Sequence, residues 1–410
     1  DTLLPALANL HSHSFQRAMA GMTERRGPTA DSFWTWRTLM YRFVEKLTPD
    51  QVQAIAAQVF VEMLEAGYAS VGEFHYLHHA PGGARYDTLA ELSGRIAAAA
   101  QDTGIGLTLL PVLYSYGGAG QRALEPGQAR FGTDVDGYLR LVEGAEAACK
   151  SLPADTVVGI APHSLRATSP ADLRALLAAR PDGPVHMHIA EQPKEVADVR
   201  ATYGARPVEW ALGEIGVDPR WCMIHATHME PAETRGLAQS GAVAGLCPIT
   251  EANLGDGPFN GPSYLAHGGR FGVGSDSNVR VALAEELRTL EYSQRLRDLG
   301  RNVLGDGDQS TGARLYTMAA QGSAQAVGRS AGQLAVGALA DMVAIDSADI
   351  RLYGLQPDDL LDGWIFAADD GVVTDVWSAG RPVVTRGRHV NRDQVAQRYR
   401  AALSDLVDGL

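Results

Sequence analysis

Cysteine is scarce in this chain of 410 residues. Its three cysteines, Cys149, Cys222 and Cys247, lie far apart, and no two of them have the CxxC spacing. This usage indicates a reducing compartment and excludes a cysteine-rich zinc knuckle. No apolar run reaches the roughly 18 residues needed to span a bilayer, and no signal-like segment opens the chain. We therefore expect a cytoplasmic protein with no membrane partner.

Long blocks of basic residues are also absent. Lys and Arg number 35 against 48 Asp and Glu, which gives a formal net charge of −13. Nucleic acid is therefore not an expected partner, although the local field of a pocket can still favour an anionic small molecule. A hydrophobic fraction of 45% and a charged fraction of 20% are typical of a globular protein. The length suffices for one large α/β barrel or two ordinary domains.

Short apolar runs alternate with longer helical patterns over most of the chain. Helical patterns such as 49–67 and 86–104 lie between expected strands. The expected strands cover residues 5–11, 69–75, 106–113, 156–162, 184–189, 221–226, 242–247 and 270–275. Eight strands with intervening helices favour a closed (β/α)8 barrel of the TIM type over an open sheet.

The pattern changes after about residue 330. Segments such as "GQLAVGALADMVAIDSADIR" are β-rich, are punctuated by glycine and have no alternating helices. We expect a barrel over residues 1–328, a small accessory β subdomain over 329–392 and a terminal helix over 393–410. The sequence begins at Asp1, directly before a core-like strand, so we also expect a preceding segment outside this numbering.

Side chains that can bind a metal ion or move protons follow several of the expected strands. They are His11 and His13 on the first, His163 on the fourth, His188 on the fifth, His225 on the sixth and Asp276 after the eighth. Residues i and i+2 of a strand point to the same side, so the imidazoles of His11 and His13 face one point. The carboxyl ends of barrel strands meet at one mouth, where barrel active sites lie. The positions predict a site at that mouth.

Four motifs make the chain similar to a known group. The motifs "HSH", "HIAEQ", "HATH" and "GSDSN" follow the first, fifth, sixth and eighth strands. Together with the C-terminal "GQLAVGALADMV", they resemble the amidohydrolase superfamily in its deaminase and chlorohydrolase branch. The resemblance covers almost the whole chain and implies a barrel with an accessory β-sandwich, which the preceding segment completes, and a homodimer. The fourth strand, "GIAPHSL", lacks the lysine that bridges two metals in binuclear members, which favours one metal ion.

The resemblance implies roles for the residues at the mouth. One divalent metal ion, zinc, is bound by His11, His13, His188 and Asp276, and these ligand types leave zinc versus iron open. A bound metal ion lowers the pKa of water from 15.7 to about 7. Glu191 is the implied proton shuttle. His225 hydrogen-bonds the attacking hydroxide or the reacting carbon's substituent, and Asp276 also orients the hydroxide.

Residues beyond the metal motif indicate the substrate. The stretches "SFQRAMAG" (14–21), "DSFWTWRTLMYRF" (31–43, expected to be an aromatic loop), "GEFHY" and "APHSLRA" resemble the formiminoglutamate deiminase family of histidine degradation. Its members hydrolyse N-formimino-L-glutamate to N-formyl-L-glutamate and ammonia. Two arginines at one mouth can neutralise the two carboxylates of such a substrate. The implied substrate-binding residues are Gln16, Arg37, Tyr76, His163 and Arg166, with the assignment of each arginine to a carboxylate left open.

Two other readings compete with this one. The chain could be a guanine or adenosine-type deaminase, in which Glu251 and Asn253 of "CPITEANLGDG" would read a planar base. It could also be a non-catalytic barrel kept as a scaffold, although the presence of four ligands and Glu191 weighs against this reading. The remaining polar residues near the motifs are expected to be structural: Arg17, His186 and His228.

Overall fold

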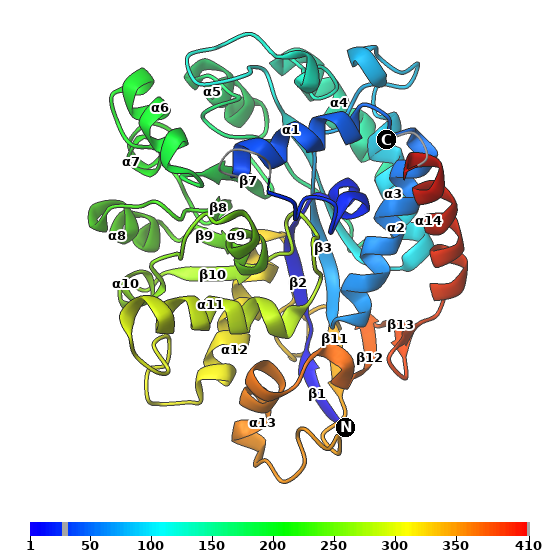
Figure 1. Cartoon of the computed structure of the whole chain (residues 1–410), viewed down its shortest axis with the longest axis vertical. Coiled ribbons are helices and arrows are strands. Elements are labelled where there is room, and N and C mark those ends of the chain that lie inside the picture. Colours follow the sequence, from blue (N-terminus) through cyan, green and yellow to red (C-terminus); the bar gives the residue numbers. More distant parts are fainter. Residues whose placement is uncertain (27–31, 408–410) are drawn as a thin grey trace.

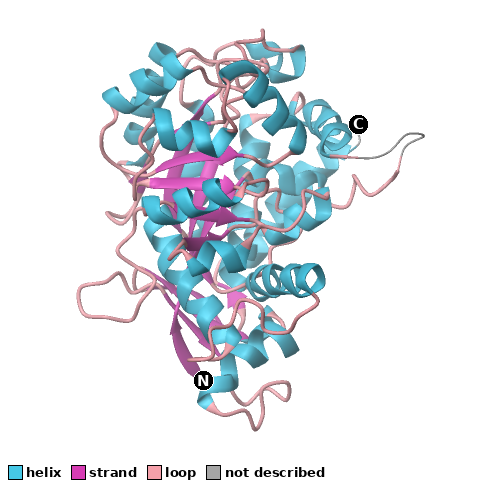
Figure 2. Cartoon of the chain, turned by 90° about the vertical axis from the view of Figure 1, so that its left-hand side faces the viewer, coloured by secondary structure: helices cyan, strands magenta, loops and turns pink. Residues whose placement is uncertain are grey.

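Parallel strands form the centre of the protein, and helices surround them (Figures 1 and 2). The computed structural model describes residues 1–26 and 32–407. The parallel strands are β2 (Leu7–Ser12), β3 (Tyr68–His75), β4 (Gly106–Leu113), β5 (Val157–Val158), β6 (Ala161–Pro162), β7 (Val185–Ile189), β8 (Trp221–His225), β9 (Val243–Leu246) and β10 (Arg270–Val273). All eight expected strands are present, and the strand expected over 156–162 is split into β5 and β6.

Parallel pairing continues from β2 to β10 and returns to β2. β2, β3 and β4 pair in this order, and β4 pairs with both β5 and β6. β7, β8, β9 and β10 form a second parallel run. Single bridges between Ile160 and Val185 and between Ser12 and Asp276 join the two runs. The carboxyl ends of all these strands therefore lie on one side of the molecule.

Helices follow most of these strands and cover them from outside. They are α1 (Phe33–Val44), α2 (Pro49–Glu65), α3 (Glu91–Thr103), α4 (Val135–Cys149), α5 (Pro170–Ala179), α6 (Pro193–Tyr203), α7 (Pro207–Glu214), α8 (Pro231–Ser240), α9 (Pro248–Leu254), α10 (Gly261–Ala266), α11 (Leu283–Asp298) and α12 (Thr311–Ala326). α2 begins where Thr48 accepts a hydrogen bond from Gln51 N and Pro49 takes the first helical position. The helices expected over 49–67 and 86–104 correspond to α2 and α3.

Helix α1 replaces the aromatic loop expected over 31–43. Ser32 begins this helix as the N-cap of a capping box with Thr35. Phe33, Met40, Phe43 and Val44 are its buried residues, whereas Asp31 lies outside the described residues. The expectation of a loop was wrong because the buried residues sit at helical spacing, which the density of aromatic side chains masks. Figure 1 shows α1 lying across the carboxyl ends of the parallel strands.

The packing of α12 against β10 depends on a glycine. A Cβ atom on Gly322 of α12 would lie 1.9 Å from the carbonyl oxygen of Phe271 in β10. No side chain fits at this distance, so the glycine lets the helix backbone approach the strand directly. This contact positions β10, and β10 leads into Asp276.

An antiparallel sheet lies at the other end of the molecule, beside the N-terminus (Figure 1). Its strands, in spatial order, are β1 (Thr2–Pro5), β11 (Met342–Ile345), β12 (Val373–Ser378), β13 (Arg381–Thr385) and β14 (Arg388–His389). β1 pairs with β11, so Thr2–Pro5 belong to this sheet and not to the unit expected over 1–328. The chain changes sheets at Ala6, whose N–H donates to the carbonyl oxygen of Asp341.

A buried ion-pair cluster joins this sheet to the parallel strands. The guanidinium of Arg329 is 1% exposed and lies 2.9 Å from Asp155 Oδ2 and 3.2 Å from Asp341 Oδ2. Arg381 of β13 also pairs with Asp155, at 2.7 Å. Each buried carboxylate in the cluster thus faces a guanidinium, as burial of a charge requires.

Two further helices are α13 (Leu360–Asp362), which precedes β12, and α14 (Arg392–Val407), which follows β14. α14 lies beside α2 (Figure 1). It corresponds to the helix expected over 393–410, of which residues 408–410 lie outside the described part of the chain. Within residues 1–26 and 32–407, no helix combines the length and apolar character needed to cross a membrane.

Candidate active site

The expected metal ligands meet where the parallel run returns to β2. His11 lies in β2 and His13 directly follows it, His188 lies in β7, and Asp276 follows β10. His13 N donates to Asp276 O and Asp276 N donates to His11 O, each over 2.9 Å. Asp276 takes a φ of 44°, in the left-handed region that costs a non-glycine residue about 1–3 kcal/mol. The two backbone hydrogen bonds hold this conformation and direct the carboxylate towards the histidines.

The four side chains offer donor atoms at the spacing of a metal site. His11 Nε2 lies 3.1 Å from His188 Nε2 and 3.4 Å from Asp276 Oδ1. His13 Nε2 lies 3.2 Å from the same Oδ1. All four donor atoms lie within 4.8 Å of one another, and all four residues are buried. A tetrahedral zinc ion with bonds near 2.0–2.1 Å would place its ligands about 3.3 Å apart, so the arrangement fits a metal ion.

The protonation of the imidazoles fits a metal ion as well. His13 Nδ1 lies 3.0 Å from Phe74 O, and His188 Nδ1 lies 3.2 Å from His163 O. A carbonyl oxygen only accepts, so each Nδ1 carries the proton and each Nε2 presents a lone pair to the cluster. Burial lowers the pKa of His11 to about 3 and that of His188 well below its usual value, which keeps both rings neutral. Neutral imidazole is the form that binds metal.

A second group of possible ligand atoms contains His225, Cys247 and Asp276. It shares Asp276 with the first group. Burial raises the pKa of the Cys247 thiol well above its usual value, whereas a thiol must be deprotonated to bind a metal ion. The group of three histidines and Asp276 is therefore the better metal site within the described residues.

His225 lies at the end of β8 among three carboxylates. Its Nε2 is 3.8 Å from Glu191 Oε1 and 3.9 Å from Asp276 Oδ2, and its Nδ1 is 3.1 Å from Glu251 Oε1. Burial alone would lower the pKa of His225, but the charges of Glu191 and Asp276 and the hydrogen bond to Glu251 raise it to about 10. The three carboxylates therefore favour the protonated form of this imidazole.

The backbone that carries Glu191 is held by a neighbouring carboxylate. Glu195 in the first turn of α6 accepts hydrogen bonds from Ala190 N at 3.2 Å and from Glu191 N at 3.0 Å. Ala190 has a φ of 51°, so the chain turns sharply after β7. This turn directs the Glu191 side chain into the pocket.

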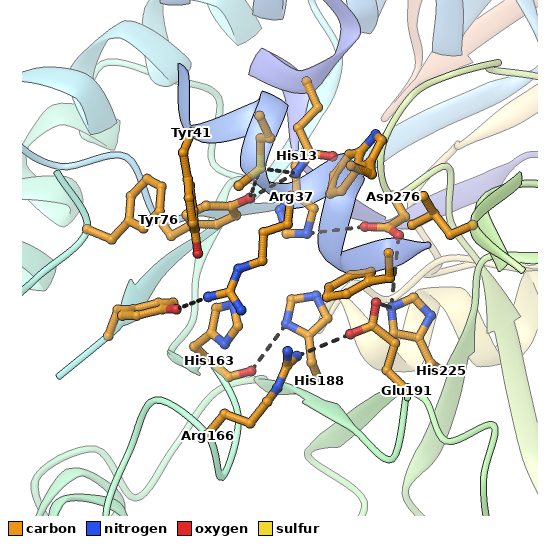
Figure 3. Close-up of a pocket in the computed structure, with 17 residues that line it drawn as sticks. His13, Arg37, Tyr41, Tyr76, His163, Arg166, His188, Glu191, His225 and Asp276 are labelled. Carbon is orange, nitrogen blue, oxygen red and sulfur yellow. Dashed lines mark hydrogen bonds and ion pairs between the residues drawn. The ribbon is translucent and has the colours of Figure 1, made fainter. Parts of the chain in front are cut away.

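A pocket opens beside the metal ligands, and all five expected substrate-binding residues line it (Figure 3). The space between its walls, open solvent included, is about 530 Å³. The expected residues that line it are Gln16, Arg37, Tyr76, His163 and Arg166, and it is also lined by Glu191, His225 and three of the metal ligands, His13, His188 and Asp276. The structure thus brings the whole expected site together.

Hydrogen bonds fix the polar side chains of the pocket. Gln16 Nε2 donates to the Tyr76 hydroxyl at 2.8 Å. Arg37 Nη2 donates to the Tyr114 hydroxyl at 2.9 Å, and Arg166 Nη2 donates to Glu191 Oε2 at 3.1 Å. Burial and the charges of Arg166 and Arg37 together lower the pKa of His163 well below its usual value, so both guanidiniums act on this imidazole.

Sequence reasoning missed two tyrosines of the pocket. Tyr41 lies on α1 with its ring 5.2 Å from the Arg37 guanidinium carbon, and Tyr114 directly follows β4. Tyr114 occupies the same position relative to its strand as the predicted Tyr76 does after β3. That equivalence was the signal in the sequence that could have identified Tyr114.

The two residues considered as readers of a planar base do not line the pocket. Glu251 turns to His225, and Asn253 Nδ2 donates to Glu24 Oε1 at 2.9 Å.

Two residues expected to be structural have structural contacts. His186 Nε2 donates to Ala326 O at 2.7 Å, and Arg17 pairs with Glu62 at 2.8 Å outside the pocket.

The comparisons with known proteins agree with this geometry. The model of the amidohydrolase family matches residues 2–383. The formimidoylglutamate deiminase of Pseudomonas aeruginosa is 51% identical to this chain over 408 residues, which make up 99% of this chain and 90% of that protein. The crystal structure of an amidohydrolase from Brucella melitensis has a TM-score of 0.94 at 50% identity, covering 99% of this chain and 90% of that one.

A more distant structure shares the fold. The adenosine deaminase from Xanthomonas campestris, determined with bound zinc, has a TM-score of 0.81 at 22% identity and covers 99% of this chain and 86% of that one. The resemblance expected from the motifs, and with it a hydrolase acting on a carbon–nitrogen bond, is confirmed by the family model and the half-identical relative. The chain belongs to the amidohydrolase family.

Proposed function

We propose that the protein hydrolyses N-formimino-L-glutamate to N-formyl-L-glutamate and ammonia. Its 51% identical relative is named formimidoylglutamate deiminase. One observation carries the proposal beyond the family. Two guanidiniums, those of Arg37 and Arg166, line a pocket that also holds the candidate metal ligands. A substrate with two carboxylates and an amidine complements this pocket, because guanidinium forks bind carboxylates in pairs of hydrogen bonds.

We infer that His11, His13, His188 and Asp276 hold a single zinc ion. Three imidazoles and one carboxylate suit zinc, and the closeness of their donor atoms supports one ion among them. The stretch from β5 to β6 has no lysine that could bridge a second ion. When bound, the ion supplies Lewis acidity and lowers the pKa of a water molecule to about 7.

In the proposed reaction, water adds to the formimino carbon and the bond from this carbon to its terminal nitrogen breaks. Glu191 accepts a proton from the water and passes it to the departing nitrogen. It then carries the remaining proton from the hydroxyl of the adduct to the same nitrogen, which leaves as ammonia. Asp276 orients the water, and His225 donates a hydrogen bond to the oxygen that attacks the formimino carbon. The carboxylate of Glu191 lies 3.8 Å from His225, so the two groups can act on one reacting centre.

We assign the substrate's carboxylates to the polar wall of the pocket. Arg37 and Arg166 neutralise them, and Gln16, Tyr76 and His163 add hydrogen bonds. Gln16 Oε1 is buried without a hydrogen-bond partner while Nε2 is held by Tyr76, so this oxygen can accept a hydrogen bond from an N–H of the substrate. The low pKa of His163 keeps its ring neutral, so it binds by hydrogen bonding.

The same proposal includes the finer architecture. We infer that the parallel strands form a (β/α)8 barrel, with the active site at its carboxyl end as in other barrels. The antiparallel sheet of β1 and β11–β14 would form part of an accessory β-sandwich. A homodimer remains a prediction from the family.

An assay of ammonia release tests the function. The purified protein is given N-formimino-L-glutamate, N-formimino-L-aspartate or guanine, and metal content is measured on the same sample. The proposal predicts that formiminoglutamate has the highest kcat/KM of the three. Ammonia from guanine but not from formiminoglutamate would establish a nucleobase deaminase instead, and a metal-free, inactive protein would favour a scaffold.

A further inference from the structure

Arg166 is bound to the residue assigned to proton transfer. Its Nη2 lies 3.1 Å from Glu191 Oε2, and the two side chains are 11% and 6% exposed. A second carboxylate, that of Glu195, lies 3.9 Å from Arg166 Nε. In Figure 3 the guanidinium of Arg166 points into the pocket while a dashed line ties it to Glu191. Arg166 is thus shared between the pocket wall and Glu191.

The two arginines of the pocket differ in this respect. The ion pairs found among residues 1–26 and 32–407 include Arg166 but none that involves Arg37. Arg37 donates to the neutral hydroxyl of Tyr114 and lies over the ring of Tyr41. Its positive charge is therefore free to attract an anion, whereas the charge of Arg166 is already balanced. A carboxylate that binds Arg166 has to compete with Glu191.

We propose that Arg166 couples the binding of a carboxylate to the release of Glu191. In the free enzyme Arg166 holds the Glu191 carboxylate to one side. When a carboxylate of the substrate reaches Arg166, it takes over this charged hydrogen bond, and Glu191 turns to the amidine. The inference rests on the proposed function and narrows its substrate class. The substrate is an amidine whose own carboxylate activates the enzyme.

The buried surroundings of Arg166 favour exchange over simultaneous binding. Glu191 and Glu195 already give this guanidinium two acidic neighbours, and a substrate carboxylate would add a third negative charge in a site with little water. Burial raises the pKa of Glu195, so the cluster already resists negative charge. Like charges repel strongly where water is excluded, and rotation of the Glu191 side chain away from Arg166 would relieve the repulsion. Arg166 Nε, which is buried without a hydrogen-bond partner, offers the incoming carboxylate a donor.

The coupling has a consequence for selectivity. An amidine without a carboxylate leaves Glu191 held by Arg166, so its turnover is slow even when it occupies the pocket. The carboxylate then contributes to kcat and not only to KM, because its binding energy is used to free the proton shuttle. Discrimination against neutral amidines would come from the catalytic step.

A substrate supplied in two pieces tests the coupling on the wild-type enzyme. Formamidine provides the amidine, and propionate provides a carboxylate small enough to leave the reacting end open. We expect propionate to raise kcat for formamidine about 10-fold or more, with sodium chloride at the same ionic strength as the control. Unchanged or purely inhibited formamidine turnover in the presence of propionate would overturn the inference.

Variants of arginine sharpen the same test. Arg166→Met removes the partner of Glu191, so we expect it to hydrolyse formamidine faster than wild type and to lose the response to propionate. Arg174→Met, at an exposed arginine that lies 3.9 Å from Glu214, is the matched control and should respond as wild type does. A propionate response retained in Arg166→Met would contradict the coupling. Hydrolysis of formiminoglutamate by wild type without propionate activation would refute only this inference, whereas no hydrolysis of formiminoglutamate would refute the proposed function.

Discussion

Glu251 lies behind His225, outside the pocket. Its removal tests whether turnover requires the hydrogen bond that fixes the His225 imidazole. Glu251 Oε1 accepts hydrogen bonds from both His225 Nδ1 at 3.1 Å and Cys247 N at 2.9 Å. A single oxygen thus holds the imidazole and anchors itself to the backbone. Glu251→Ala removes both hydrogen bonds, whereas Glu251→Gln can keep both through its amide oxygen and removes only the charge.

The expected size of the effect follows from these contacts. A hydrogen bond to a charged group contributes about 1.5–3 kcal/mol, and a neutral one about 0.5–1.5 kcal/mol. Since about 1.36 kcal/mol corresponds to a tenfold change in rate, loss of the charged hydrogen bond that holds His225 should lower kcat by roughly 10- to 150-fold in Glu251→Ala. Glu251→Gln exchanges a charged for a neutral hydrogen bond, so its kcat should fall by about tenfold. KM for formiminoglutamate should change little in both variants, because Glu251 does not line the pocket.

Steady-state ammonia release gives kcat and KM, and thermal unfolding with metal analysis shows whether the variants remain folded and loaded. Glu214→Gln, at an exposed glutamate, serves as the control and should match wild type. A Glu251→Ala enzyme that is folded, holds its metal and keeps kcat within twofold of wild type would show that His225 needs no support from Glu251.

Three further outcomes follow from the structure. Glu191→Gln should keep the metal and lose about 10²- to 10⁴-fold in turnover, and near-normal activity would remove Glu191 from the mechanism. Tyr114→Phe removes the hydroxyl that Arg37 and Gln128 share at 2.9 and 3.0 Å, so KM should rise more than kcat falls; an unchanged KM would show that Arg37 needs no support. Gly322→Ala should destabilise the fold by about 1–3 kcal/mol in denaturant unfolding, because the new methyl group would overlap Phe271 O; wild-type stability would contradict this contact.

Much of the site could be predicted because its residues occur at strand ends. His11 and His13 are two residues apart in the sequence, which predicted that both side chains point to one side of β2. The positions of His188 near the end of β7 and of Asp276 after β10 predicted the edge of the sheet at which all four residues meet. These inferences needed only the alternation of strands and helices, which local apolar patterning records well.

The remaining features depend on tertiary contacts that local patterning does not record. The aromatic residues of α1 suggested a loop, but their spacing buries one side of a helix against the pocket. A single strand was expected over 5–11, whereas the chain changes sheets at Ala6 because Thr2–Pro5 find their hydrogen-bond partners in β11. Glu251 suggested a base reader because the sequence cannot show that its carboxylate turns to His225.

In the proposed reaction, three histidines and Asp276 hold one metal ion that the hydrolysis requires. The most direct test measures metal content and ammonia release from N-formimino-L-glutamate on the same preparations of wild type and His188→Ala, before and after chelation. We expect about one zinc ion per wild-type chain, activity that disappears with the metal and returns when zinc is restored, and loss of both in His188→Ala. Full activity in metal-free wild-type protein would show that the hydrolysis needs no metal ion.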